Sequence, residues 1–124
     1  MLVDDDPDNN NIFAIALRDD GFEVNAFEDP EVALSVFKPN YYDLVILDIT
    51  MPKMHGDELC QKLTRIDNKL KVCFITASEP GEYESRFLPG SLNSTHFMRK
   101  PITIDELVKK IDEIIMQMDK QNKH

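Results

Sequence analysis

Five polar side chains stand at the carboxyl ends of short apolar runs in this sequence, and their types suggest a chemistry. They are the carboxylates, hydroxyl and amine of Asp4, Asp5, Asp48, Thr76 and Lys100. Carboxylates brought together repel one another, and burying them is costly unless a cation compensates the charge. Oxygen ligands of this kind suit Mg²⁺, which binds one or two carboxylates together with waters and substrate oxygens. The amine and the hydroxyl could then meet the oxygens of a phosphoryl group carried by a carboxylate.

The apolar runs that precede these side chains alternate with segments of helical period. This alternation predicts repeated strand, helix, strand units and hence a parallel sheet of the α/β class. The expected strands are residues 1–3, 22–26, 44–47, 72–76 and 95–99. Because the carboxyl ends of parallel strands share one edge of the sheet, the five polar side chains should converge there.

The expected helices carry start signals, stop signals and apolar stripes. Gly21 should end a first helix over residues 7–20. Asp29 with Pro30 should begin a second helix, which Pro39 closes. The helical side chains expected to face the core are Phe13, Ala16, Leu17, Val32, Ala33, Val36, Phe37, Leu59, Leu63, Ile66, Leu107, Ile111, Ile114, Ile115 and Met118.

The last third of the sequence is patterned less evenly. Only seven residues separate Gly81 from Pro89, so a fourth helix there should be short or irregular. Thr103 and Glu106 form a capping box that should begin the last helix. Residues 119–124 should fray. We therefore expect a single domain over the 124 residues, with about five helices.

Composition and charge restrict what this domain can do. Its hydrophobic fraction of 42% is ordinary for a globular protein, and its apolar runs are too short to span a bilayer. The net charge of -9 would repel a phosphate backbone, so direct nucleic-acid binding is not expected. Cys60 and Cys73 lack CxxC spacing, and no signal-peptide pattern is present. We expect a cytoplasmic protein in which both thiols are buried.

Four short motifs, in this order, resemble those of the response-regulator receiver family. They are V-D-D at residues 3–5, L-D-I-T-M-P at 47–52 followed by Gly56, I-T-A at 75–77, and F-M-R-K-P at 97–101. The resemblance covers nearly the whole chain. It implies a flavodoxin-like, doubly wound sheet of five parallel strands in the order 2-1-3-4-5.

The resemblance also implies a role for each acidic residue of the set. Asp48 would accept a phosphoryl group from a phosphohistidine. Asp4, Asp5 and Asp48 would hold Mg²⁺, or Mn²⁺ in its place, together with the backbone carbonyl of Thr50.

The remaining motif residues are implied to carry the response to phosphorylation. Thr76 would be the switch hydroxyl that moves toward the phosphoryl group, and Lys100 would be the ion-pair partner of that group. Phe97 would be the aromatic side chain whose rotamer follows the switch. Pro101 would follow a cis peptide bond.

The implied function is that of a phosphoacceptor switch in a two-component system. Such a domain is not a turnover enzyme, although it catalyses its own phosphorylation and slow autodephosphorylation. The expected donor is a histidine kinase or a phosphotransfer protein. The expected receiver of the signal is a downstream protein or a second copy of the domain, with no nucleic-acid or membrane partner.

Two other interpretations remain open at this point. A small Mg²⁺-dependent phosphohydrolase would also place a nucleophilic aspartate after a strand, but it predicts an acid two residues beyond Asp48, where Thr50 stands. A degenerate receiver would act only as a protein-interaction module. Its usual sign is loss of the acceptor or the acids, and all of them are present here. Asp6 and Asp8, outside the aligned pair, are expected to be helix caps or solvated turn residues.

Overall fold

A computed structural model describes residues 1–77 and 95–121 of the chain. Its five parallel strands form one sheet in the order β2-β1-β3-β4-β5, as predicted. The strands are β1 (Leu2–Val3), β2 (Ala26–Phe27), β3 (Leu44–Asp48), β4 (Lys71–Thr76) and β5 (Thr95–Arg99). The helices are α1 (Pro7–Asp19), α2 (Pro30–Val36), α3 (Gly56–Ile66) and α5 (Ile104–Gln121). The fourth helix, expected between Gly81 and Pro89, falls outside the described residues.

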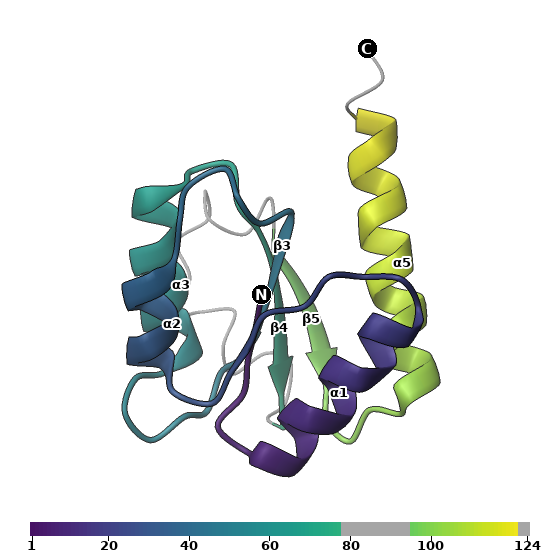
Figure 1. Cartoon of the computed structure of the whole chain (residues 1–124), viewed down its shortest axis with the longest axis horizontal. Coiled ribbons are helices and arrows are strands. Elements are labelled where there is room, and N and C mark those ends of the chain that lie inside the picture. Colours follow the sequence, from purple (N-terminus) through teal and green to yellow (C-terminus); the bar gives the residue numbers. More distant parts are fainter. Residues whose placement is uncertain (78–94, 122–124) are drawn as a thin grey trace.

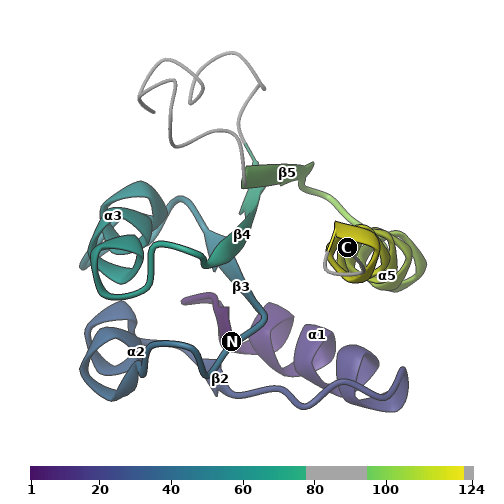
Figure 2. The same ribbon diagram turned by 90° about the horizontal axis from the view of Figure 1, so that it is seen from above.

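The helices form a layer on each face of the sheet, and Figure 2 shows these layers clearly: α1 and α5 cover one face, and α2 and α3 cover the other. All five residues of β3 are buried. A central strand covered on both faces needs no polar side, which explains the unbroken apolar run in its sequence. Two separate groups of buried side chains fill the spaces between the sheet and the two helical layers.

Capping residues begin and end α1 as predicted. The Asp6 carboxylate accepts hydrogen bonds from the backbone N–H groups of Asp8 at 3.0 Å and Asn9 at 3.4 Å. At the other end, Gly21 has a φ of 102° and donates its N–H to the carbonyl of Arg18. This backbone conformation favours glycine, because a Cβ would be strained there.

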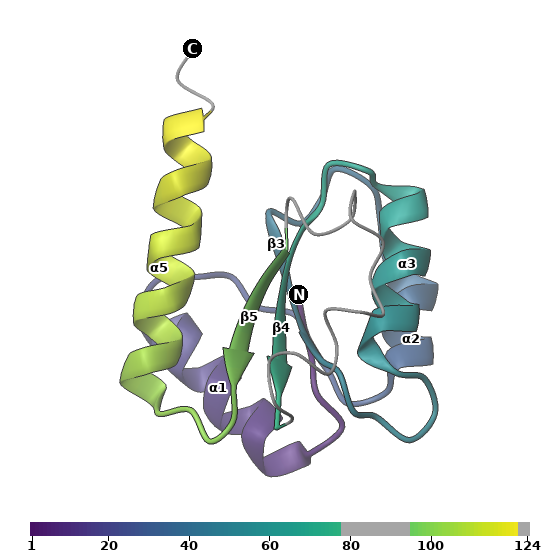
Figure 3. The same ribbon diagram turned by 180° about the vertical axis from the view of Figure 1, so that it is seen from behind.

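The predicted caps of α2 and α5 are also confirmed. Asp29 accepts a hydrogen bond from the N–H of Glu31 at 2.9 Å. The N–H of Glu106 donates to Oγ1 of Thr103 at 3.1 Å, and the Glu106 carboxylate accepts from the Thr103 N–H at 3.5 Å. Helix α5 continues to Gln121, whereas the sequence predicted fraying from residue 119. Figures 1 and 3 show its C-terminal half extending beyond the sheet. None of the helices in the described part of the chain is long and apolar enough to cross a membrane.

The face that α2 buries differs from the one predicted. Val32 and Val36 were expected in the core, but they are 47% and 45% exposed. The helix has only seven residues, and Phe37 leaves it with an extended ψ of 136°. The element therefore packs through Ala33 and through Phe37, which lies beyond the end of the helix.

Two other helices differ from the prediction by one side chain each. In α1 the buried stripe contains Ala14, while Ala16 is only half-buried. In α3 the last buried residue of the helix is Leu63, and Ile66 lies outside the buried stripe and is 44% exposed. The helical spacing of apolar residues located the helices correctly, but it did not determine which residues at the edge of each stripe are buried.

The second strand is shorter than the range 22–26 predicted for it. Its two residues pair with β1, Ala26 with Leu2 and Phe27 with Val3. A strand extends only as far as it has partners, and β1 itself has two residues. Residues 22–25 alternate between apolar and polar side chains, but β1 is too short to offer them backbone partners.

Candidate functional site

The carboxyl ends of β1, β3 and β5 bring four of the five predicted side chains into one cluster, at the lower edge of the sheet in Figure 1. One carboxylate oxygen from each of Asp4, Asp5 and Asp48 lies within 4.8 Å of the others. Lys100 reaches two of them: its Nζ lies 3.6 Å from Oδ2 of Asp4 and 3.3 Å from Oδ2 of Asp48. The cluster thus joins three acids and one cation.

The acidic pair after β1 combines an inner and an outer carboxylate. Asp4 is 1% exposed, whereas Asp5 is half-buried. Oδ1 of Asp4 accepts a hydrogen bond from the Asp6 N–H at 3.0 Å. Its Oδ2 is buried and has no hydrogen-bond partner among the described residues. A buried oxygen without a donor is costly, and a hard divalent cation at this position would satisfy it.

Asp48 lies at the end of β3, where the following loop begins. Its side chain is buried, and its Oδ1 accepts a hydrogen bond from the Thr50 N–H at 3.3 Å. The neighbouring Ile49 donates its N–H to the carbonyl of Ile75 in β4 at 3.1 Å and accepts from Gly56 at 2.8 Å. These bonds fix the backbone on both sides of the carboxylate, so the side chain has a defined direction.

Burial sets the protonation behaviour of the two inner carboxyl groups. Removal from water raises the pKa of Asp48 from 3.8 to about 6. The charge of Lys100 lowers this pKa, and the neighbouring Asp4 raises it. Burial likewise raises the pKa of Asp4, against the lowering effects of the Asp6 N–H and of Lys100. One ammonium group is therefore too little to compensate three carboxylates, and the set fits an additional cation.

Thr76 is the last residue of β4, and Lys100 directly follows the neighbouring strand β5. The Lys100 N–H donates to the backbone carbonyl of Thr76 at 2.7 Å. Thr76 is 4% exposed at the end of β4, which lies between the strand of Asp48 and the strand before Lys100. The peptide bond between Lys100 and Pro101 is cis, as the resemblance implied.

Phe97 lies on the same sheet but away from the cluster of charges. It is half-buried in β5 and stacks on Phe74 of β4, with ring centroids 5.4 Å apart and an interplanar angle of 24°. Its side chain packs on the face covered by α2 and α3. The movement expected of Phe97 and Thr76 stays a prediction.

The site has two acids after the first strand, one at the end of the third and a lysine after the fifth. This arrangement agrees with the comparison of the sequence with known families. A model of the response regulator receiver domain matches residues 1–112. The chain belongs to that family. The receiver domain of this chain is also similar to individual proteins of known sequence and structure.

Three comparisons illustrate the range of these relatives. The sensor histidine kinase RcsC of Escherichia coli (strain K12) is 32% identical over 105 residues, which cover 85% of this chain and 11% of the kinase. The probable transcriptional regulator ycf27 of Pyropia yezoensis is 32% identical over 120 residues, 97% of this chain and 48% of that protein. The structure of response regulator TrrA from Thermotoga maritima, in complex with Mg²⁺-BeF, has a TM-score of 0.72 and 30% identity, and the match covers 91% of this chain and 95% of TrrA. The receiver domain therefore spans about a tenth to a half of these two curated relatives.

Asn10 is a residue of the receiver domain that the sequence interpretation missed. Its side chain lies in the buried stripe of α1, 6% exposed. Its amide nitrogen donates to the backbone carbonyls of Asp4 at 3.0 Å and Phe27 at 2.8 Å. The side chain thereby fixes α1 to the ends of β1 and β2, next to the acidic pair. A polar residue one turn before Phe13 in an otherwise apolar stripe was the available signal.

Gly56 was quoted within a motif, and the structure supplies the reason for a glycine there. It begins α3 and lies against the backbone that carries the phosphoacceptor candidate. A Cβ on Gly56 would overlap the carbonyl oxygen of Asp48 and press on the Cα of Ile49. Only glycine lets the helix start so close to the end of β3.

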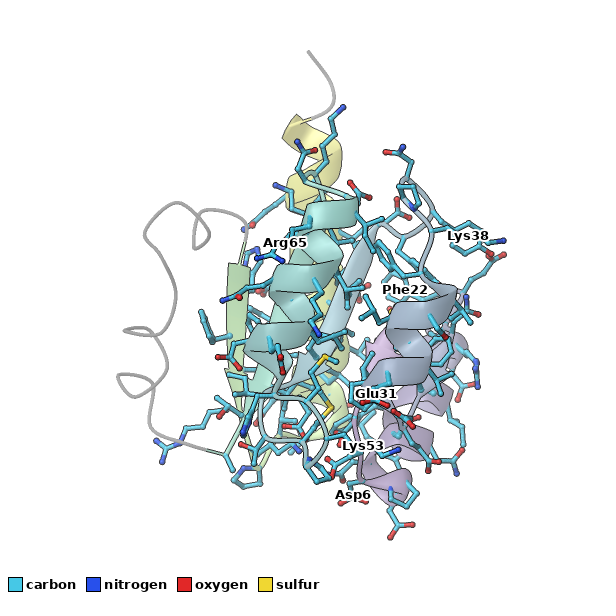
Figure 4. All side chains as sticks on the ribbon, turned by 90° about the vertical axis from the view of Figure 1, so that its left-hand side faces the viewer. Asp6, Phe22, Glu31, Lys38, Lys53 and Arg65 are labelled. Carbon is cyan, nitrogen blue, oxygen red and sulfur yellow. The ribbon has the colours of Figure 1, made fainter. Side chains whose placement is uncertain are left out.

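An ion pair also connects the loop after β3 to the start of α2. Nζ of Lys53 lies 2.8 Å from Oδ2 of Asp29, whose other oxygen caps α2. Figure 4 shows Lys53 beside Glu31, at the end of the molecule where Asp6 begins α1. Both partners of the pair are partly exposed, so its contribution to stability is small. Its position suggests that it orients the loop that contains Thr50.

Proposed function

We propose that this receiver domain is a phosphoacceptor switch in which the Asp48 carboxylate takes a phosphoryl group from a phosphohistidine. The observation that carries the proposal is the cluster itself. Asp48 is buried, the Lys100 ammonium lies within 4 Å of both Asp48 and Asp4, and Oδ2 of Asp4 lacks a hydrogen-bond donor among residues 1–77 and 95–121. The family match supports it.

The donor set fits Mg²⁺. Asp4, Asp5 and Asp48 would hold the ion, together with the carbonyl of Thr50, and Mn²⁺ could take its place. When bound, the ion supplies charge neutralisation for the three carboxylates and for the incoming phosphoryl oxygens. A structural relative bound to Mg²⁺-BeF supports this assignment.

The chain's own residues would position and activate the acceptor. Ionised Asp48 forms the new oxygen–phosphorus bond while the phosphorus–nitrogen bond of the donor breaks, and the imidazole leaves with the electron pair and takes up a proton. The Thr50 N–H holds one carboxylate oxygen, so the side chain stays in line with the donor. The ammonium of Lys100, 3.3 Å from the carboxylate, would pair with a phosphoryl oxygen.

The response would pass through the strands next to the site. Phosphorylation adds about two negative charges at this edge. The hydroxyl of Thr76 would move toward them, and Phe97 would change its rotamer beside Phe74, altering the surface over β4 and β5. A downstream protein or a second copy of the domain would recognise the altered surface.

The donor would be a histidine kinase or a phosphotransfer protein in the cytoplasm. A groove of about 700 Å³ runs beside Lys100, between the start of α1 and the start of α5. Ile12 and Ile104 line it and are 45% and 46% exposed. Exposed apolar side chains beside Lys100 are suited to contact the donor protein while its histidine reaches Asp48.

Intact mass spectrometry after incubation with acetyl phosphate and Mg²⁺ tests the proposal. We expect one added phosphoryl group, lost slowly afterwards, with none on Asp48→Asn and none in EDTA. Equal labelling of Asp48→Asn would show that the acceptor is a different residue. Continuous release of phosphate without accumulation of the labelled protein would instead indicate a phosphohydrolase.

A further inference from the structure

The β2 side of the candidate site carries negative charge beyond the three clustered carboxylates. Strand β1 pairs in register with β2 on one side and with β3 on the other. The residues that directly follow β1 and β2, Asp4 and Glu28, therefore lie side by side, in one row with Asp48 at the end of β3. Neighbouring strands lie about 5 Å apart, so the backbone of Glu28 is about 10 Å from that of Asp48.

Four more acidic residues lie beside this row, at the starts of the first two helices. Together with Glu28 they form a group that we call the acidic rim, which consists of Asp6, Asp8, Glu28, Asp29 and Glu31. All of them are exposed except Asp29, which is half-buried. Figure 4 shows Asp6 and Glu31 at the same end of the molecule, with Lys53 beside them. Lys53 pairs with Asp29 at 2.8 Å and so compensates one charge of the rim.

Helix capping explains why acids stand at four of these positions, but it does not neutralise them. Asp6 and Asp29 cap α1 and α2, and Asp8 and Glu31 lie in the first turns of these helices. The start of a helix carries about half a positive charge, whereas each of these helices has two carboxylates there. A net negative charge therefore remains beside the site.

The cations of the site belong to the inner carboxylates. Nζ of Lys100 lies 3.6 Å from Asp4 and 3.3 Å from Asp48. A divalent ion held by Asp4, Asp5 and Asp48 would, together with Lys100, balance these three charges and leave the rim charged. A phosphodonor that approaches Asp48 would meet the rim at roughly 10 Å, well within the screening length of about 30 Å in dilute salt.

We propose that the acidic rim selects the phosphodonor by charge: it slows transfer from free anionic phosphates and favours a phosphohistidine that lies on a basic protein surface. This selection rests on the proposed transfer to Asp48 and identifies the chemistry of the partner. Basic side chains around the donor histidine would face Glu28 and Glu31 while the histidine reaches Asp48. Complementary charges of this kind act mainly on the rate of encounter.

Two triple variants with the same change in net charge test the proposal. The rim variant combines Asp8→Asn, Glu28→Gln and Glu31→Gln, all at exposed positions outside the proposed Mg²⁺ site. The control variant combines Asp19→Asn, Glu23→Gln and Glu113→Gln, which are also exposed. In the control set, Glu23 precedes β2 at the opposite edge of the sheet, and Asp19 and Glu113 line a groove between the end of α1 and α5.

The rate of phosphoryl addition to Asp48 is measured by intact mass at pH 7, with saturating Mg²⁺ and two small donors. Acetyl phosphate is a dianion, whereas the protonated nitrogen of phosphoramidate leaves that donor one net negative charge. We expect the rim variant to react about tenfold faster than the native chain with acetyl phosphate at ~10 mM salt, and about threefold faster with phosphoramidate. Glu28→Gln alone should give about a twofold gain with acetyl phosphate. The control variant should match the native chain, and at ~1 M salt all of these differences should disappear.

Synthetic histidine peptides, phosphorylated on the imidazole, test the nature of the partner. A peptide with lysines on both sides of the phosphohistidine should label Asp48 of the native chain faster than the same peptide with glutamines. The rim variant should lose most of this preference, because the carboxylates that the lysines would face are gone.

The remaining outcomes separate this inference from the proposed function. Equal rates for the native chain and the rim variant, or equal gains in the two triple variants, would overturn selection by the rim while leaving transfer to Asp48 intact. An undiminished preference of the rim variant for the lysine peptide would show that the basic surface is recognised elsewhere. Absence of label on Asp48 with every donor would overturn the proposed function, and the selection with it.

Discussion

Replacing Asp48 with asparagine should stabilise the receiver domain at neutral pH in the absence of metal. The folded protein holds this carboxyl at a pKa of about 6, against 3.8 for the ordinary value. Between these two pH values the folded state keeps a proton that the unfolded state has lost, so the contribution of this carboxyl group to stability falls as pH rises from 4 to 6 and is level above 6. A shift of about two pKa units corresponds to a cost of about 3 kcal/mol at pH 7.

The pH dependence of the gain separates this effect from other consequences of the substitution. The buried carboxamide of Asp48→Asn carries its own desolvation cost, but that cost does not titrate. The stability difference between variant and native protein should therefore be about 2 to 3 kcal/mol larger at pH 7.5 than at pH 4. Comparing this stability difference at two pH values cancels the desolvation cost of the carboxamide, which is the same at both.

Urea unfolding in EDTA at pH 4, 5, 6 and 7.5 provides the measurement. Asp19→Asn, which removes one exposed carboxylate from α1, is the matched control for the loss of an acidic side chain. Millimolar Mg²⁺ should raise the stability of the native protein more than that of the variant. The reasoning that burial and repulsion raise the pKa of Asp48 would be refuted if Asp48→Asn gave no gain in stability, or the same gain at all four pH values.

Three further substitutions test the supports of the site. Asn10→Leu should cost about 1 to 3 kcal/mol in urea unfolding, because it removes both hydrogen bonds that its amide makes to backbone carbonyls; a neutral result would mean that water replaces the amide. Gly56→Ala should lower both the melting temperature and the rate of labelling by acetyl phosphate, because the alanine Cβ would overlap the backbone of Asp48. Normal labelling would show that α3 can shift to make room for it. Lys53→Met should leave the melting temperature nearly unchanged but weaken Mg²⁺-dependent labelling, because it removes the ion pair with Asp29 that orients the loop containing Thr50. Lys53→Arg should restore the labelling. Unchanged labelling of Lys53→Met would show that the ion pair does not affect the site.

Much of this molecule follows from local patterns in the sequence. Asp6 and Gly21 limit α1 because a cap needs only the neighbouring backbone. The capping box of Thr103 and Glu106 starts α5 for the same reason. The convergence of Asp48 with the acids after β1 follows from strand order, because parallel strands end at a common edge.

Other features depended on contacts between segments far apart in the chain. The exposure of Val32 and Val36 reflects how a short α2 meets the sheet, and the periodicity of the sequence alone cannot give that orientation. The double hydrogen bond of Asn10 exists only because β1 and β2 end side by side next to α1.

The electrostatics of the site were decided by the tertiary structure alone. The sequence placed Asp48 near other charges, but its pKa of about 6 comes first from burial beneath the surrounding chain. Burial depends on how every layer packs, and the ion pairs with Lys100 depend on ångström distances across the sheet. Residue types and spacing determined which groups meet. Packing determined how exposed they are, how their charges balance, and that Oδ2 of Asp4 finds no hydrogen-bond donor within residues 1–77 and 95–121.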